Sequence, residues 1–308
     1  DEAVQRLGTD QVRTGERVVA ARETANGAVA EILHADGTRS ERACDILVGA
    51  DGIHSALRQQ FYPDEGAPRW NGMMMWRGTT LARPFLDGRT MVQAGHRRAK
   101  FVVYPIEPVR PDGLQRINWI CDRRLREDGF GGGLTAPSRE DWSKPGSLDD
   151  LLPTFGSWRF AWLDVPGLIR AAEQILEWPM VDRDPLPRWR HGHTTLLGDA
   201  AHPMYPIGSN GATQAILDAA ALAQALDGHA SITAALNAYE AARLPMTRDI
   251  VAMNRREGLD AILDMVEEAA PEGFARIEDV TDPKVLAEWV QAYKKAAGHQ
   301  VGRPQSAP

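Results

Sequence analysis

The residues best suited to chemistry lie in one segment, 196–212, which has the sequence LLGDAAHPMYPIGSNGA. A buried strand is predicted to end at Gly198-Asp199, and a helix is predicted to begin near Gly211. Gly208 and Gly211 let backbone N–H groups approach a ligand closely. The first turn of that helix adds unpaired N–H groups and a positive dipole end, which suit a phosphate or a ring edge with negative charge. Asp199 is placed to accept a hydrogen bond from a sugar-type hydroxyl; alternatively, it only caps a turn that the glycines shape.

A second segment, 45–58, has the sequence DILVGADGIHSALR. Its strand, 46–48, lacks polar alternation and is therefore predicted to be buried on both faces. Asp51 and Gly52 stand at the turn that follows the strand. Ser55 is a candidate N-cap for a short helix over 55–61, and Arg58 lies one turn further on. The alternative is an ordinary strand-to-helix turn in which Arg58 pairs with Asp51.

Two other kinds of catalytic site are not supported by the sequence. His191, His193 and His202, taken with Asp199, match no zinc-ligand spacing, so we expect no metal site. A GxSxG motif does not occur, and residues 52–55 have the wrong spacing for a serine nucleophile.

The composition is that of an ordinary globular protein, because 43% of the 308 residues are hydrophobic and 25% are charged. With 35 Lys+Arg against 42 Asp+Glu, the net charge is −7, so neither nucleic acid nor an anionic membrane surface is an expected partner. Arg97, Arg98 and Lys100 form a short basic cluster that we interpret as a solvated face. Cys44 and Cys121 make no disulfide framework, which favours a reducing, cytoplasmic location.

The termini and the apolar segments give no sign of a membrane or export signal. The longest apolar stretch, 219–226, is too short to span a bilayer. The first residues, 1–4, are not a signal peptide and lack an initiator Met, so we expect a processed, truncated or partly recorded chain.

The elements that position these residues change in character along the chain. Residues 10–50 predict strands joined by hairpin turns at Asn26-Gly27 and Asp36-Gly37. A tryptophan-rich segment, 70–187, predicts a largely antiparallel sheet with two short helices and a Gly131–Gly133 loop. The later predicted strands are 73–76, 90–93, 101–104, 117–121 and 194–197. The predicted helices are 148–155, 168–174 and 211–226, further helices within 232–269 with a break or kink at Pro245, and a last helix over 284–297. The tail, 302–308, is predicted to be frayed.

Taken together, the two segments resemble a known family. DGIHSALR (51–58) resembles the DG motif of the flavoprotein aromatic hydroxylases, and GDAAHP (198–203) followed by PIGSNGA (206–212) resembles their GD motif. Shorter matches resemble the phenazine-carboxylate hydroxylase branch, and these are MWRG (75–78), FLDG (85–88), YPI (104–106) and PMVDRDPLP (179–187). The resemblance runs from about residue 3 to about residue 257.

This resemblance implies a mixed α/β (α+β) fold with an FAD/NAD(P)-binding Rossmann-like domain of the para-hydroxybenzoate-hydroxylase type. The implied domains are an FAD-binding domain over 1–68 and 188–262, an inserted antiparallel substrate domain over 69–187, and C-terminal helices and tail over 263–308. The family's strand–GxGxxG–helix unit, which binds the FAD pyrophosphate, does not occur in these 308 residues. We therefore expect an N-terminally incomplete FAD domain. The C-terminal helices either pack on that domain or support a homodimer.

The implied activity is that of an FAD-dependent monooxygenase. FAD is reduced by NADH or NADPH, reacts with O₂, and transfers one oxygen to an aromatic or heteroaromatic substrate through a flavin hydroperoxide. A phenazine-carboxylate-like compound is the implied substrate, while another heteroaromatic ring or an oxidase reaction stays open. The alternative from a different class is a truncated, inactive fragment that only binds planar aromatic ligands.

The resemblance also assigns residues to roles. Asp199 is expected to bind the ribityl chain, and Pro206 to lie close to the flavin ring. The hydroxyl of Tyr205 is expected to meet the substrate, and Arg77 to pair with a substrate carboxylate, the alternative for Arg77 being a structural ion pair. The implied cofactor-binding residues are Asp51, Gly52, Arg58, Gly198, Asp199, Pro206, Gly208, Ser209, Asn210 and Gly211. The implied catalytic residues are Tyr205 and Pro206, and the implied substrate residues are Trp76, Arg77, Tyr104 and Tyr205.

Overall fold

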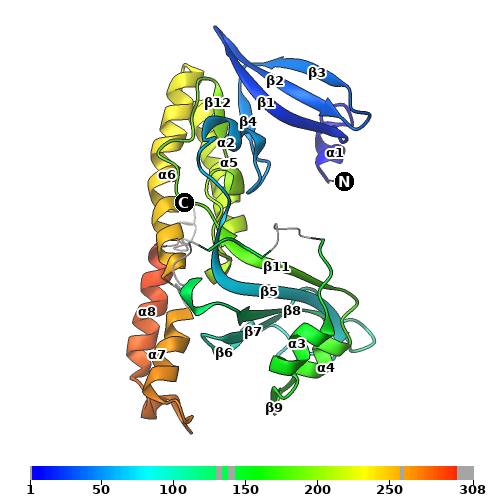
Figure 1. The fold of residues 1–308 in the computed structure, drawn as a ribbon, viewed down its shortest axis with the longest axis vertical. Coiled ribbons are helices and arrows are strands. Elements are labelled where there is room, and N and C mark those ends of the chain that lie inside the picture. The colour runs from blue at the N-terminus through cyan, green and yellow to red at the C-terminus, as the bar shows by residue number, and fades with distance from the viewer. Residues whose placement is uncertain (1, 130–133, 138–142, 257–259, 297–308) are drawn as a thin grey trace, which may run out of the picture. The chain divides into compact units, whose positions relative to one another are not determined.

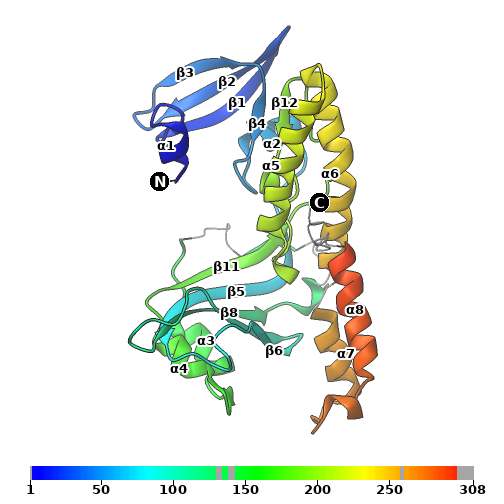
Figure 2. The ribbon, with the colours of Figure 1, turned by 180° about the vertical axis from the view of Figure 1, so that it is seen from behind.

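The computed structural model describes residues 2–129, 134–137, 143–256 and 260–296 (Figures 1 and 2). The chain divides into two compact units. Unit 1 consists of residues 1–67, 183–204 and 209–252, and unit 2 consists of residues 68–182, 205–208 and 253–308. Each unit has a hydrophobic core and is described by itself. The predicted Gly131–Gly133 loop and the 302–308 tail lie outside the described residues.

Unit 1 opens with a short helix, α1 (Glu2–Leu7), and an antiparallel sheet in the order β1-β2-β3. β1 (Glu16–Thr24) and β2 (Gly27–His34) meet at the first predicted turn, where Thr24 pairs with Gly27. β3 (Arg39–Cys44) follows the second predicted turn, at which Gly37 has a φ of +83°. Both predicted hairpins are therefore confirmed.

The strand of the DG segment, β4 (Leu47–Gly49), pairs in parallel with β12 (Thr194–Leu196). Within the described residues β12 is the one strand paired with β4, and the Val48 side chain is 36% exposed. The prediction that this strand is buried on both faces is therefore wrong, because the Val48 side chain stays exposed among the described residues. The predicted helix after the strand is confirmed as α2 (Ala56–Phe61).

Two long helices, α5 (Gly211–Gly228) and α6 (Ile232–Arg255), lie side by side (Figures 1 and 2). Apolar residues of both helices pack with Leu57, Trp189 and Leu196 in the core of unit 1. α6 continues through Pro245, so the predicted break does not occur at this proline, while the alternative, a kink, stays a prediction. Side chains on either side of the proline are buried and bonded, and they keep the helix in one piece.

Unit 2 contains an antiparallel sheet in the order β11-β5-β8-β7-β6, which confirms the predicted antiparallel sheet. Its strands are β5 (Arg69–Ala82), β6 (Val92–His96), β7 (Ala99–Pro105), β8 (Gln115–Arg124) and β11 (Ile175–Asp182). β5 is the longest of these strands, and it pairs with β11 on one side and with the central strand β8 on the other.

One face of this sheet, which we call face A, carries most of the aromatic core. Trp76, Phe101 and Trp119 point to face A and pack against α3 (Leu148–Phe155) and α4 (Val165–Arg170). α4 begins three residues before the predicted start of 168 and ends before 174. The Asp164 side chain caps it by accepting the Gly167 N–H, while β11 takes the chain from Ile175. The remaining short elements of this region are η1 (Glu127–Gly129), β9 (Arg159–Phe160) and β10 (Leu163–Asp164).

The opposite face, face B, follows from the alternation of side chains along each strand. Met73, Met75 and Arg77 of β5 alternate with the face A residues Met74 and Trp76. The remaining face B residues, assigned from the same alternation and from the strand register, are Lys100, Val102 and Tyr104 of β7, Asn118, Ile120 and Asp122 of β8, and Leu176, Trp178 and Met180 of β11.

The basic cluster at 97–100 is only partly solvated: Arg98 is exposed as predicted, but for Lys100 the prediction of a solvated face is wrong. Lys100 is only 6% exposed, and its ammonium pairs with Asp122 at 3.1 Å and with Asp260. Asp260 directly precedes α7 (Ala261–Ala269), so this pairing joins face B to the C-terminal helices. Burial lowers the pKa of Lys100, but the two carboxylates outweigh it and raise the pKa above its ordinary value.

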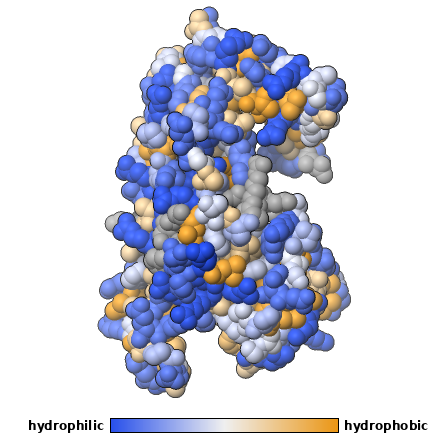
Figure 3. Space-filling view, in the orientation of Figure 1, coloured by the Kyte–Doolittle hydropathy of each residue, from blue (hydrophilic) through white to orange (hydrophobic). Residues whose placement is uncertain are grey.

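α7 and α8 (Pro283–Ala296) lie side by side in both views, with the short turn η5 (Ile277–Asp279) between them in sequence (Figures 1 and 2). None of the helices in the described ranges is long and apolar enough to cross a membrane. On the face shown in Figure 3, apolar residues are scattered among hydrophilic ones.

We expect Gly78→Ala to destabilise the protein by about 1–3 kcal/mol, because an overpacked core forces side chains off their rotamers. A Cβ at Gly78 would lie 2.3 Å from the ring of Trp119, its partner across β5 and β8. Gly228→Ala is the matched control, since a Cβ there meets no atom within 4 Å. Urea unfolding of both variants measures the difference. Equal midpoints would show that the Trp119 ring tolerates a Cβ at position 78.

Candidate functional site

The turn at Gly198-Asp199 is fixed by a buried carboxylate, Asp218 of α5. Gly198 has a φ of +60°, and its N–H donates to Asp218 Oδ2 at 3.0 Å. His202 Nε2 lies 2.5 Å from the same oxygen, and Arg243 Nε donates to Oδ1 at 2.7 Å. Asp218 therefore joins the turn η2 (Gly198–Ala200) to both α5 and α6.

The charge of Asp218 is stabilised by its donors. Burial raises the pKa of this carboxyl, but the bonds from His202, Arg243 and Gly198 outweigh burial and hold the pKa below its ordinary value. Arg243 also donates to Gln214 Oε1 at 2.6 Å, which satisfies a second buried polar group of α5. With this many donors, the Asp218 carboxylate has a structural role and holds the surrounding elements together, and it is not a proton donor at neutral pH.

Asp199 differs from Asp218 in that it is exposed and forms no hydrogen bond with any other described residue. The surrounding protein raises the pKa of its carboxyl by desolvation, with a smaller opposing effect of His202. A Cβ placed on Gly211 would lie 3.9 Å from Asp199 Oδ1, so the first residue of α5 stands beside this carboxylate. The N-cap residue Asn210 forms no side-chain capping bond, which leaves the first N–H groups of α5 without a cap from it.

The DG turn is held by its own side chains. Gly52 has a φ of +78°, which a residue with a side chain rarely adopts. Asp51 Oδ2 accepts the Ala56 N–H at 2.8 Å, and Ser55 Oγ accepts the Arg58 N–H at 3.1 Å. The predicted N-cap role of Ser55 is therefore confirmed. The alternative pairing of Arg58 with Asp51 is wrong, because Asp51 instead caps α2 and Arg58 pairs with Glu65.

Arg58 is the residue that connects the two motifs. Its side chain is 1% exposed, and Nη1 donates to the carbonyls of Ala200 at 3.1 Å and Ala201 at 2.8 Å. Nε and Nη2 donate to the Glu65 carboxylate, and Nη2 also donates to the Asp184 carbonyl at 2.9 Å. All five N–H groups of a guanidinium are thus used within the protein. Arg58 therefore holds the turn at Ala200–Ala201 against the DG segment, and its cofactor role stays a prediction.

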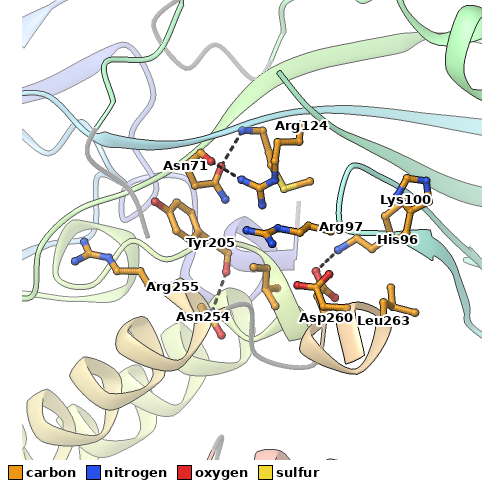
Figure 4. Close-up of a pocket in the computed structure, with 13 residues that line it drawn as sticks. Asn71, His96, Arg97, Lys100, Arg124, Tyr205, Asn254, Arg255, Asp260 and Leu263 are labelled. Atoms are coloured by element: carbon orange, nitrogen blue, oxygen red, sulfur yellow. Dashed lines mark hydrogen bonds and ion pairs between the residues drawn. The ribbon is translucent and has the colours of Figure 1, made fainter. Parts of the chain in front are cut away.

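The loop residues Tyr205–Gly208 belong to unit 2. Tyr205 is buried, its hydroxyl donates to the Arg69 carbonyl at 3.4 Å, and its own carbonyl accepts Asn254 Nδ2 at 3.0 Å (Figure 4). Burial raises the pKa of Tyr205 well above its ordinary value. Pro206 is exposed, and Gly208 in η3 (Ile207–Ser209) has a φ of +72°.

A pocket of unit 2 lies next to Tyr205 (Figure 4). Its walls mix basic and acidic side chains, and much of this charge is paired inside the protein. Arg255 pairs with Asp182, Lys100 pairs with Asp260, and Arg124 donates to the Asn71 carbonyl. The labelled residues around it are Asn71, His96, Arg97, Lys100, Arg124, Tyr205, Asn254, Arg255, Asp260 and Leu263.

The four predicted substrate residues do not all share one face of the sheet. Trp76 lies on face A, where it is buried in the aromatic core, and its Nε1 donates to Glu177 at 3.0 Å. Arg77 and Tyr104 lie on face B, and Tyr205 packs on the same face through Met73 and Met180. The roles of all four residues remain predictions.

Several residues around the site were not recognised from sequence. Asn118 accepts a hydrogen bond from Arg77 Nε at 2.7 Å, and the three others are Glu65, Asp218 and Arg243. Among the described residues no group of three or more potential ligands is arranged to hold a metal. The histidines considered for such a site have other contacts: His202 with Asp218, His193 with Glu23, and His191 stacked on Phe61.

A family model described as FAD binding domain matches residues 1–132 and 166–254, and the chain therefore belongs to this FAD-binding domain family. Within it, the chain is 45% identical over 258 residues to phenazine 1,6-dicarboxylic acid hydroxylase PhzS of Lysobacter antibioticus, covering 82% of this chain and 61% of that protein. It is 31% identical over 258 residues to 3-hydroxybenzoate 6-hydroxylase 1 of Aquipseudomonas alcaligenes, covering 82% and 59%.

Solved structures share the fold. Klebsiella pneumoniae HpxO complexed with FAD and uric acid has a TM-score of 0.64 at 24% identity, over 96% of this chain and 66% of that chain. A salicylate hydroxylase substrate complex has a TM-score of 0.65 at 22% identity, over 99% and 76%. The mixed α/β fold of the flavoprotein hydroxylases is thereby confirmed. The chain spans about 60% of the length of the curated relatives described above.

We expect Asp218→Asn to lower the free energy of unfolding at pH 7 by roughly 3 kcal/mol, because it leaves buried Arg243 without its carboxylate. Because the pKa of Asp218 is lowered in the folded protein, its charge adds to the free energy of unfolding at pH values above its ordinary pKa of 3.8. This contribution is lost as the pH falls through the folded-state pKa. The difference from the wild type should therefore shrink in acid.

Asp227→Asn, an exposed change on the same helix, serves as the control and should follow the wild type. Urea unfolding at pH 7, 5, 4 and 3 measures all three proteins. A constant difference at every pH would contradict the role of the Asp218 charge.

Proposed function

We propose that this protein acts as an FAD-dependent, NAD(P)H-consuming monooxygenase that hydroxylates an aromatic or heteroaromatic, phenazine-carboxylate-like substrate. The observation that carries the proposal is the exposed carboxylate of Asp199 beside the uncapped N-terminus of the 18-residue helix α5. Membership of the FAD-binding domain family supports it, as does a relative at 45% identity that is named a phenazine 1,6-dicarboxylic acid hydroxylase.

The residues present fit the sugar-like chain and the ring edge of FAD. Asp199 supplies an acceptor for a ribityl hydroxyl, and its carboxylate has no described hydrogen-bond partner that would compete. The free N–H groups at the start of α5 and the positive dipole end of the helix stabilise negative charge on the pyrimidine edge of the ring. Gly208 has the positive φ that allows its backbone to approach a planar ligand. Bound FAD supplies the transfer of electrons from NAD(P)H and the activation of O₂.

Other residues do not face the ligand but hold these groups in position, namely Arg58, Asp51 and Asp218. Arg58 holds the carbonyls of Ala200 and Ala201, so the turn that presents Asp199 keeps its shape. Asp218 fixes the N–H of Gly198 on the other side of the same turn. The protein thereby orients the acceptor before a ligand arrives, which reduces the entropic cost of binding.

Face B is the proposed surface for the aromatic substrate. Met75, Ile120 and Trp178 give it an apolar centre, and Arg77 stands next to them with an exposed guanidinium. Within the described ranges no carboxylate pairs with Arg77, so its positive charge is available to a substrate carboxylate. These observations support a planar substrate with one anionic end.

The proposal also includes a reducing, cytoplasmic location and a homodimer. Cys44 and Cys121 are free thiols, and burial raises the pKa of Cys121, which keeps it in the unreactive thiol form. Val285 and Trp289 of α8 are exposed apolar residues, which suit a contact between two copies of the chain.

We expect Asp199→Ala to weaken FAD binding by about tenfold or more, because a buried ligand hydroxyl loses its acceptor. Asp199→Asn keeps an oxygen acceptor and should lie between the wild type and the alanine variant. The measurement is the visible spectrum of each protein with added FAD, after free cofactor has been removed. A colourless wild type would contradict FAD binding by this chain, and equal retention in all three proteins would contradict the role of Asp199.

We expect Arg77→Ala to raise the apparent KM for carboxylated substrates by about tenfold or more, because a charge-assisted hydrogen bond is lost. The kcat and the KM for uncharged analogues should change little. Steady-state NAD(P)H oxidation with paired carboxylated and uncharged compounds measures both. An equal rise of KM for the two compounds would contradict the proposal that Arg77 recognises the substrate carboxylate.

A further inference from the structure

Arg77 has a neutral partner, whereas several buried arginines of this protein pair with a carboxylate. Arg58 pairs with Glu65, Arg243 with Asp218 and Arg255 with Asp182, each through a carboxylate. Arg77 is held instead by the amide oxygen of Asn118, 2.7 Å from its Nε. In the described part of the chain Arg77 makes no ion pair.

Asn118 is fully buried at the centre of three strands. In the strand register it stands opposite Thr79 of β5 and Tyr104 of β7, and Arg77 is its diagonal neighbour. The side chain is 0% exposed. Because Arg77 Nε is only a donor, the amide oxygen of Asn118 must face it, and the amide nitrogen must point elsewhere.

The amide nitrogen of Asn118 is buried and forms no hydrogen bond with any described residue. An unsatisfied buried donor costs free energy and calls for an explanation. Aspartate has the same shape without that donor, and it would form an ion pair with Arg77 as well. The ion pair with Arg77 would offset part of the cost of burying that carboxylate.

The difference between the two residues is the charge left on Arg77. An aspartate at 118 would neutralise the guanidinium, whereas asparagine fixes its Nε and leaves the remaining N–H groups and the full positive charge on face B. The apolar centre at Ile120 and Met75 lies beside this charge, since Ile120 is paired with Arg77 across β5 and β8. A planar body on that centre would place its anionic end at Arg77.

We propose that Asn118 is a positioning residue that determines specificity, because it orients Arg77 without neutralising it and so preserves recognition of the carboxylate of an aromatic ligand. This inference rests on the proposed function, since it concerns the same substrate. It assigns the selectivity for carboxylated over uncharged rings to a residue that need not touch the ligand.

The test compares affinity and stability in the same variants. Phenazine-1-carboxylate and phenazine are the probes, and quenching of tryptophan fluorescence in the full chain gives the Kd of each. Asn118→Asp should reduce the preference for the carboxylate by about tenfold or more, because the charge that attracts it is neutralised. The Kd of phenazine should stay within about threefold, and the melting temperature should change little, because the ion pair with Arg77 and the removal of an unsatisfied donor offset the cost of burying the carboxylate.

Two further variants separate charge from structure. Asn118→Ser keeps an uncharged acceptor and should retain most of the carboxylate preference. Thr80→Val removes a buried hydrogen bond on face A, to the Leu168 carbonyl, and should lower the melting temperature without changing the preference. Selectivity and stability should therefore move independently.

The outcomes distinguish this inference from the proposed function. A wild type that prefers the carboxylate, together with an Asn118→Asp variant that keeps the preference within about threefold, overturns the role of Asn118 and leaves the proposed function intact. A wild type that binds neither probe, or both equally, overturns the substrate class and this inference together. Loss of preference in Asn118→Asp with an unchanged or raised melting temperature supports both.

Discussion

The fixed geometry of unit 1 depends on the guanidinium of Arg58. Its five N–H groups all find acceptors, and these acceptors come from parts of the chain up to 143 residues away. A buried charge is tolerated only where it is fully paired, so the surrounding carbonyls and Glu65 must keep their positions for the unit to be stable. The same requirement fixes the turn that carries Asp199. A constraint that stabilises the fold thus also orients the group that we propose for FAD.

Unit 2 is subject to a different constraint, because one sheet carries the aromatic core on face A and the proposed substrate surface on face B. Trp76 and Trp119 bury large rings on face A, where they belong to the same hydrophobic core as residues of α3 and α4. The alternation of side chains along β5 then sends Met75 and Arg77 to face B. Because a shift of one residue would exchange the two faces, the packing of the tryptophans also determines that Arg77 points to the proposed substrate surface.

Local patterns in the sequence predicted local structure well. The turns before Gly27 and around Gly37 and the Ser55 cap depend on a few neighbouring residues, and all three are confirmed. The predictions that were wrong depend on distant partners. Lys100 lies near two arginines in sequence, yet it is buried and pairs with Asp260, which is 160 residues away. The orientation of Trp76 likewise follows from strand register, which no single segment encodes.

The distribution of unsatisfied groups gives the strongest link between fold and function. Arg58 and its partners complete their hydrogen bonds inside the protein, as such groups must when they hold elements together. Asp199, the N-terminus of α5 and Arg77 leave theirs incomplete within the described residues. We propose a ligand for each of the three: a hydroxyl for the carboxylate, negative charge for the helix end, and an anion for the guanidinium. In this proposal, a cofactor with a sugar-like chain and an anionic ring edge, together with an aromatic carboxylate, would occupy all three positions.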